Sequence, residues 1–325
     1  MIDQWVGRLP RRLRDQPIIK QERLHLLRSK QIRNRRSIEW LFILLLVSGI
    51  GFQIADRFQP QIAQFLNQPL RGVESFIDWA KDFLPSIAIL LLIVQHLGVG
   101  WTALRLASGT LARERQNRTW ETLVLTAVSA RRIVFGKWLA VITLQWQFQR
   151  RALLLRAALI AWVLFEAHFQ QPPPLETWGI AALGVVLVAL APMVNVLFGA
   201  AVGVLASAFT RSEVGAARVA GLLEFMVLLP LLISGGLVGN LFVRLGGLSN
   251  EISILQSTLL LAFIDGGIFA LANVVSARYL ELSAYYFMGL LLWAGVFTLI
   301  ALGIVSIAQS WVVRLGALRG VKTRL

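Results

Sequence analysis

Long apolar segments separated by shorter polar ones run along most of this chain. A helix needs about 20 apolar residues to cross the hydrocarbon core of a membrane, so the pattern predicts an all-α polytopic membrane protein with six transmembrane helices. The predicted spans are about 39–55, 84–107, 152–169, 178–209, 217–240 and 284–309. Residues 39–325 would then form a single transmembrane domain.

The composition favours a membrane protein over a soluble one. Of the 325 residues, 57% are apolar and only 15% are charged, which is typical of the membrane class. The net charge of +15 comes from basic residues that lie mostly just outside the apolar segments, as orientation signals do. No soluble domain with a basic face is evident, so the lipid bilayer is the expected partner and nucleic acid is not. The chain has no cysteine, which excludes disulfides and thiol chemistry.

Two segments are predicted to contain amphipathic helices outside the spans. Residues 1–38 hold eleven Lys and Arg against three acids, with apolar residues interspersed from Ile18 onward, which predicts a helix lying on an anionic membrane surface. A solvated basic tail is the other interpretation of this segment. Residues 56–83 are predicted to form a polar loop carrying a short amphipathic helix. The span at 39–55 has no convincing cleavage site, so it is interpreted as a retained anchor.

The third span is interrupted by arginine. Burying Arg150, Arg151 and Arg156 near the bilayer centre would cost about 2.5–3.5 kcal/mol for each side chain. We therefore expect 133–150 to lie on the membrane surface as a separate amphipathic helix, and the crossing to begin only at about residue 152. Arg156 is then expected to extend its long side chain back to the near interface.

The fourth span contains two local signals. It is overlong and contains Pro192, which predicts a kink or a tilt. Its second half carries Gly199, Gly203 and Ser207 at four-residue spacing. Small residues at that spacing predict a face on which another helix packs closely.

The sequence of residues 241–283 is compatible with two membrane topologies. The run 252–275 is apolar enough to cross the membrane, but the sequence IDGG at 264–267 is a turn signal at its centre. A full crossing would place the basic C-terminus on the side opposite the basic N-terminus. We therefore expect a re-entrant or extracellular helical hairpin before the last span, with Asp265 capping its turn.

With this topology, the basic residues fall almost entirely on one side of the membrane. Of the 32 Lys and Arg, 26 lie in four segments predicted to share that side: 1–38, 105–151, 210–218 and 310–325. Because positively charged loops stay in the cytoplasm, both termini and the loop 108–151 are expected there. The protein would be multi-pass in the cell inner or plasma membrane.

The sequence lacks recognisable catalytic and nucleotide-binding motifs. His25, His96 and His168 are far apart, and no HExxH or GxSxG motif is present. Gly136-Lys137 lacks the upstream glycine of a phosphate-binding loop. We therefore expect no metal, no bound cofactor and no enzyme activity in this chain, and any ATP hydrolysis would belong to another polypeptide.

Few polar residues are predicted at membrane depth. Glu224 could pair with Arg218 as a structural ion pair, or could lie on a translocation path. Asn195, Gln95 and His96 are expected mainly to form hydrogen bonds between helices. Asn195 and Glu224 remain the candidates for an intramembrane polar site.

The stretch 111–140 carries a specific pattern: an acidic–basic pair, a Thr-x-Glu-x-Leu run, and a Gly-Lys pair that opens the next helix. The residues concerned are Glu114, Arg115, Thr119, Glu121, Leu123, Thr126, Ser129, Gly136 and Lys137. This pattern resembles the cytoplasmic loop of ABC-type exporter permeases of the type-2 class. Arg118 and Ala127 stand where that family commonly has glycine and proline. Segments 17–37 and 205–217 are also similar to the family.

The resemblance implies a permease subunit that pairs with a second one, identical or paralogous, and docks two ATPase subunits that bind ATP and Mg²⁺. A coupling helix at about 113–126 would place Arg118, Glu121, Thr122 and Leu125 on the face opposite Leu123. The expected docking residues are Glu114, Arg115, Arg118, Thr119, Glu121, Thr122 and Leu125. The expected supporting residues are Ser129, Gly136 and Lys137, with Ser129 as the N-cap of the next helix.

Two other functions are consistent with the same spans. One is a stand-alone intramembrane enzyme or an ion-coupled carrier that uses Glu224. The other is a membrane anchor without transport. Both predict function without a partner ATPase, which separates them from the exporter permease.

Overall fold

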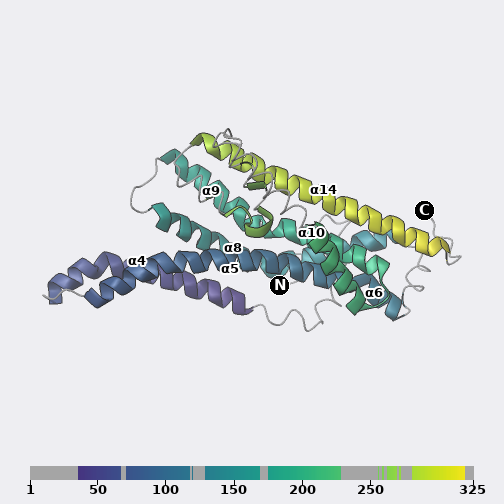
Figure 1. The fold of residues 1–325 in the computed structure, drawn as a ribbon, viewed down its shortest axis with the longest axis horizontal. Coiled ribbons are helices and arrows are strands. Elements are labelled where there is room, and N and C mark those ends of the chain that lie inside the picture. Colours follow the sequence, from purple (N-terminus) through teal and green to yellow (C-terminus); the bar gives the residue numbers. More distant parts are fainter. Residues whose placement is uncertain are drawn as a thin grey trace.

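The fold is a bundle of long helices (Figure 1). The computed structural model describes residues 36–66, 71–117, 119, 129–168, 175–227, 255, 258–259, 262–268, 271 and 280–318, and all regular secondary structure within them is helical. Three helical stretches are long and apolar enough to cross a membrane, namely Phe83–Gln116, Ala181–Phe209 and Ser283–Arg314. This is typical of a membrane protein. The predicted surface helix before residue 36 lies outside the described residues.

Helices α4 (Arg36–Leu66) and α5 (Arg71–Ser108) pack against each other and extend beyond the rest of the bundle (Figure 1). The polar loop expected within 56–83 is wrong for residues 56–66, which continue α4, whereas the helix expected in the same stretch is present as the start of α5. Phe52 of α4 and Phe76 of α5 pack edge to face with ring centroids 5.6 Å apart. This apolar contact is one reason for the extended helical pair.

The predicted kink in the fourth span coincides with a one-residue interruption of the helix at Ala191. Helix α9 (Leu175–Leu190) ends before Ala191, and α10 (Pro192–Phe209) begins at the proline itself. Proline has no backbone N–H, so Pro192 cannot donate to the carbonyl of Val188 as a continuous helix would require. The prediction of a kink at this position is confirmed.

The most extensive helix–helix contact among the described residues is between α5 and α10. A Cβ on Gly203 would lie 2.5 Å from the Leu104 carbonyl oxygen, and one on Gly199 would lie 2.6 Å from the Gly100 carbonyl oxygen. Real side chains do not approach that closely, so the two backbones meet only because these positions are glycine. The predicted small-residue face is confirmed.

Helix α8 (Ala130–His168) is continuous over its whole length. It runs antiparallel to α5: Lys137, near its start, contacts Thr110, just beyond the C-terminal end of α5, whereas Arg156 contacts Leu92 within α5. The chain between these contacts lies beside the apolar part of α5, which positions the polar side chains of α8 within the bundle.

This continuity corrects the expectation for the third span. Residues 133–150 are not a separate surface helix, and no break occurs near residue 152. Arg156 does not extend to an interface, because its side chain is completely buried. Carbonyl groups of neighbouring segments offset the cost of burying Arg156, whereas Arg151 is exposed.

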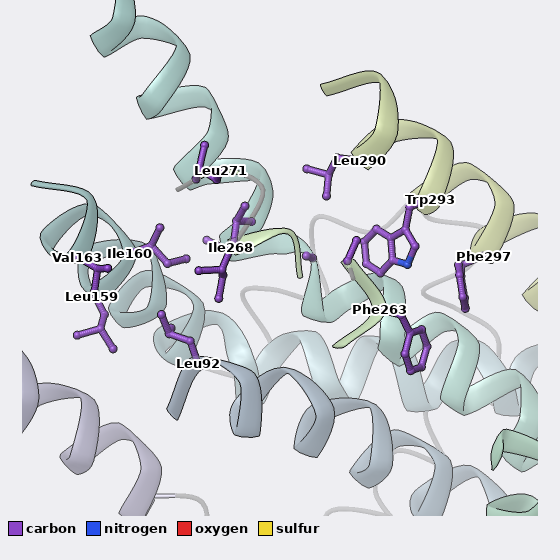
Figure 2. Close-up of a cluster of buried hydrophobic side chains, with 14 of the residues drawn as sticks. Leu92, Leu159, Ile160, Val163, Phe263, Ile268, Leu271, Leu290, Trp293 and Phe297 are labelled. Atoms are coloured by element: carbon purple, nitrogen blue, oxygen red, sulfur yellow. The ribbon is translucent and has the colours of Figure 1, made fainter. Parts of the chain in front are cut away.

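Helix α14 (Leu280–Leu318) lies along α10 and carries aromatic side chains into the core. Phe198, Phe263 and Phe297 pack together, with ring centroids 5.2–6.1 Å apart. Figure 2 shows Phe263 beside Phe297, on a separate segment that enters the bundle between the long helices.

The turn predicted at IDGG is present in that separate segment. Gly266 and Gly267 have φ angles of 72° and 86°, values that glycine adopts readily and other residues avoid. The Gly267 N–H donates to Asp265 Oδ1 at 2.6 Å, so the predicted capping role of Asp265 is confirmed. Phe263 lies against Phe297, whereas Gly267 lies against Leu290, so the chain runs antiparallel to α14 between these two positions.

Large apolar side chains cover much of the outer surface of the bundle. Those that are well over half exposed include Leu44, Leu90, Leu154, Leu291 and Leu299. They come from α4, α5, α8 and α14 and point away from the core. Large exposed apolar side chains in such number are expected where a protein faces lipid.

Candidate functional site

The charged stretch that follows α5 begins with a short helix, α6 (Thr110–Gln116). The Asn117 N–H donates to the Arg113 carbonyl at 2.9 Å and closes its last turn. The expected uninterrupted helix over 113–126 is therefore wrong, since the helix begins earlier and ends at Gln116. Four predicted docking residues lie outside the described residues: Arg118, Glu121, Thr122 and Leu125.

Ser207 of α10 fixes the start of α6. Its hydroxyl oxygen accepts hydrogen bonds from the backbone N–H groups of Leu111 and Ala112, each at 2.8 Å. These N–H groups lie in the first turn of α6 and have no acceptor within that short helix. On the small-residue face of α10, Gly199 and Gly203 thus allow α5 to approach, and Ser207 binds the start of α6.

Lys137 and Glu114 link α8 to α6. The Lys137 Nζ lies 3.1 Å from Glu114 Oε1 and donates to the Thr110 carbonyl at 3.2 Å. Lys137 is only 1% exposed, so its charge depends on these acceptors. Thr119 also donates its hydroxyl hydrogen to the Glu114 carboxylate. Glu114, a predicted docking residue, and Lys137, a predicted supporting residue, therefore form an ion pair with each other.

The arginines of α6 reach the end of α10 and the helix that follows it. Arg115 Nη1 donates to the carbonyls of Ala208 and Thr210 at 2.7 and 3.2 Å. Carbonyls at a helix C-terminus lack helical donors and attract cations. Arg113 Nη2 forms an ion pair of 2.5 Å with Glu213.

Ser129 begins α8 as predicted. The Arg132 N–H lies 3.4 Å from the Ser129 hydroxyl oxygen, and the Ile133 N–H donates to the Ser129 carbonyl at 3.2 Å. Gly136 lies buried one turn further along. The two flanks of residues 118–128 are therefore fixed to the bundle by Ser207, Glu114, Arg115 and Lys137, a set that we call the loop base.

A second group of polar side chains lies deep within the bundle, far from the loop base along α5 and α8. It consists of Gln95, His96, Arg156, Asn195 and Asp265, and we call it the buried polar cluster. Each of these residues is at most 3% exposed. They come from four segments: α5, α8, α10 and the turn at 262–268.

Arg156 is the centre of the buried polar cluster. Its guanidinium donates to the carbonyls of Leu92, Val188 and Asp265 at 2.6, 3.3 and 3.4 Å, and to Gln95 Oε1 at 2.9 Å. The Val188 carbonyl is the one that Pro192 leaves without a helical donor. Burial of a charge is tolerated where hydrogen bonds replace water in this way.

Asn195 joins α5 to the turn. Its Nδ2 donates to the Phe263 carbonyl at 3.3 Å and lies 2.8 Å from His96 Nε2. The prediction that Asn195, Gln95 and His96 form hydrogen bonds between helices is confirmed. Sequence reasoning missed Arg156, although an arginine left inside an apolar run was itself a signal of a buried polar site.

Glu224 lies elsewhere and does not join this cluster. It is 8% exposed on the helix formed by residues 213–227. Glu224 and Arg218 do not form the expected ion pair. The intramembrane pair of candidates, Asn195 and Glu224, is therefore not one site.

No group of three or more metal-ligating side chains occurs among the described residues. No known protein family, curated protein or solved structure matches this chain. The two sites are thus defined by their own geometry. The loop base fixes both flanks of residues 118–128, and the buried polar cluster places polar side chains inside an apolar bundle.

Proposed function

We propose that this chain is the membrane-spanning permease subunit of an ATP-binding-cassette exporter of the type-2 class. It would pair with a second permease subunit and be driven by a separate ATPase that binds ATP and Mg²⁺. The chain would lie in the cell inner or plasma membrane with six spans and both termini in the cytoplasm. The segment 241–283 would form a re-entrant hairpin.

The observation that carries this proposal is the loop base. A segment that receives force from a partner must be connected rigidly to the helices that it moves. Glu114 and Lys137 connect the start of the loop to α8, and Arg115 and Ser207 connect it to α10. Movement at residues 118–128 would therefore be passed to both helices.

The arrangement of α5 and α10 supports the same function. Their backbones are in direct contact through Gly199 and Gly203, so the pair would move as one body. α9 is separated from α10 by the break at Pro192, which allows a change of angle there. A rigid pair beside a hinge fits alternating access, in which one body rocks against another.

Co-purification with an ATPase tests the proposal. The tagged chain, expressed together with the ATPase encoded beside it, is expected to retain that ATPase in detergent. Glu121→Arg is expected to abolish retention and substrate-dependent ATP hydrolysis, because it reverses a charge on the predicted docking face.

The matched control is Lys81→Glu, which changes the charge by the same amount in the segment predicted to lie on the opposite side. It is expected to leave retention unchanged. An ATPase that never co-purifies, combined with transport that survives Glu121→Arg, would show that the chain works without such a partner.

A further inference from the structure

The end of α10 and the end of α14 meet through an exposed pair of aromatic side chains. Phe209 is the last residue of α10, and its ring packs against that of Trp311 with centroids 4.9 Å apart. The two side chains are nevertheless 45% and 38% exposed. Tryptophan is enriched where membrane helices meet the headgroup layer, because its ring is apolar and its N–H group is polar. The pair therefore indicates a position at the membrane surface.

The outer surface of α14 changes from apolar to basic at this position. Leu299, Leu302 and Ile307 are large exposed apolar side chains that precede Trp311. Arg314 is exposed and follows about one turn later. Ile307, Trp311 and Arg314 follow one another at helical spacings, so they share one side of the helix. A lipid lying along α14 would thus have its acyl chains beside the apolar residues and its headgroup beside Arg314.

Two further exposed arginines lie at the same end of the bundle. Arg211 follows Phe209 closely in the chain. Arg131 lies at the start of α8, and its backbone carbonyl accepts a hydrogen bond from Gln309 Nε2 at 3.5 Å, so the start of α8 lies beside the end of α14. Figure 1 shows α6 at this end as well. We call the three exposed arginines the basic rim: Arg131, Arg211 and Arg314.

The acidic side chains described at this end of the bundle already have cationic partners. Glu114 pairs with Lys137 at 3.1 Å, and Glu213 pairs with Arg113 at 2.5 Å. Arg115 brings a further positive charge and donates to the carbonyls at the end of α10. The basic rim therefore adds positive charge that these acids do not balance, and an anionic occupant fits it.

Other parts of the same chain have the wrong charge to cover the basic rim. Residues 1–38 hold eleven Lys and Arg against three acids, and the whole chain carries a net charge of +15, so this segment and a second copy of the chain are both disfavoured. An acidic soluble partner would match the arginines but would leave Leu299, Leu302 and Ile307 in water. An anionic phospholipid matches the arginines with its phosphate and the apolar side chains with its acyl chains.

We propose that the basic rim and the Phe209–Trp311 pair bind an anionic phospholipid in the leaflet on the predicted cytoplasmic side. Guanidinium groups donate several hydrogen bonds to phosphate oxygens, and basic groups between helices on the cytoplasmic side of a membrane attract anionic headgroups. The lipid would join the ends of α8, α10 and α14, which come from distant parts of the chain. This inference requires a membrane but no ATPase, so it stands independently of the exporter proposal.

Photolabelling of the purified full chain tests the binding. The chain is held in an uncharged detergent and exposed to phosphatidylglycerol that carries a photoreactive group on its acyl chain beside the ester, and labelled peptides are identified by mass spectrometry. We expect labelling within 205–211 or 299–314. Unlabelled phosphatidylglycerol and phosphatidylserine should compete about fivefold better, or more, than phosphatidylcholine with the same acyl chains. Glycerol phosphate, which has the anionic group but no acyl chain, should not compete at the same concentration.

Substitutions in the basic rim separate a site that selects charge from a merely apolar surface. Arg211→Gln and Arg314→Gln are each expected to reduce labelling about fivefold, the loss typical of one arginine at an anionic surface. Arg314→Lys keeps the charge and should retain most of the labelling. The matched control is Arg151→Gln, which removes an exposed arginine of α8 about 30 Å from Arg131 along the helix. It is expected to label like the wild type.

Several results would overturn the proposal. Labelling confined to other helices, equal competition by phosphatidylcholine, or unchanged labelling of both Arg211→Gln and Arg314→Gln would show that the basic rim does not select an anionic lipid. Competition by glycerol phosphate would identify a phosphate site without a lipid role. Absence of labelling would mean that another part of the chain covers this surface. No ATPase is present, so a failure here leaves the exporter proposal standing.

Discussion

Arg156 Nε of α8 donates to the Val188 carbonyl of α9 at 3.3 Å. In a continuous helix that carbonyl would accept the N–H of residue 192, but Pro192 has none. The helix break thus creates an acceptor, and the buried cation uses it. The hydrogen bond lowers the free-energy cost of burying the Arg156 guanidinium. It also lowers the cost of leaving the Val188 carbonyl without its helical donor.

Arg156→Met is expected to lower the free energy of unfolding by about 3 kcal/mol, since it removes the donor to three backbone carbonyls and to Gln95 Oε1. Denaturant unfolding in mixed micelles measures the change. Arg151→Met on the exposed side of α8 is the control and should change stability by less than about 0.5 kcal/mol. Equal effects of the two substitutions would contradict the central role of Arg156.

Local signals in the sequence predicted the local features well. Pro192 marks the break, Ser129 begins α8, and Asp265 caps the glycine turn, as each residue's own chemistry requires. The small-residue spacing of α10 also predicted its close contact correctly. These features depend on one segment or on one helix face, so they can be inferred from a short window of sequence.

Features assembled from several segments were missed. The cost of Arg156 was estimated against lipid, but its acceptors come from Leu92, Val188 and Asp265, which are far apart in the sequence. Hydropathy along one helix carries no information on carbonyls supplied by other helices. The same limit explains why Lys137 was assigned a supporting role without its partner.

Gly203→Ala is expected to destabilise the bundle, although alanine favours helices. Its Cβ would lie 2.5 Å from the Leu104 carbonyl oxygen and 2.7 Å from the Ala107 Cβ, so α5 and α10 must separate, at a cost of about 1–3 kcal/mol. Thermal unfolding in detergent measures the effect as a lower Tm.

Gly303→Ala is the matched control, because nothing lies within 4 Å of a Cβ at that position. There the higher helix propensity of alanine should raise stability by up to about 1 kcal/mol. The two substitutions should therefore shift Tm in opposite directions. A shift of the same sign and size would mean that Gly203 has no packing role.

The ion pair between Glu114 and Lys137 should show a measurable coupling energy. Glu114→Gln and Lys137→Met should each cost about 1–3 kcal/mol, since each leaves a partly or fully buried group with a poorer partner. The double variant should cost less than the two single costs together, by about 1 kcal/mol or more.

The ion pair between Arg113 and Glu213 is the control for this coupling energy. Their side chains are 24% and 45% exposed, so water replaces the lost partner and the coupling should stay below about 1 kcal/mol. A larger coupling here than between Glu114 and Lys137 would contradict the assignment of the buried pair to the loop base.

The predicted membrane topology can be tested by labelling single introduced cysteines, because the chain has no cysteine of its own. A single cysteine at Lys81, Asn250 or Ser276 should react with a membrane-impermeant maleimide in intact cells, since all three lie in segments predicted outside. Leu125→Cys should react only after permeabilisation. If 252–275 crossed the membrane fully, the cysteines replacing Asn250 and Ser276 would react from opposite sides. Reaction of both cysteines in intact cells would therefore support the hairpin. Reaction of only the cysteine replacing Asn250 would support a full crossing.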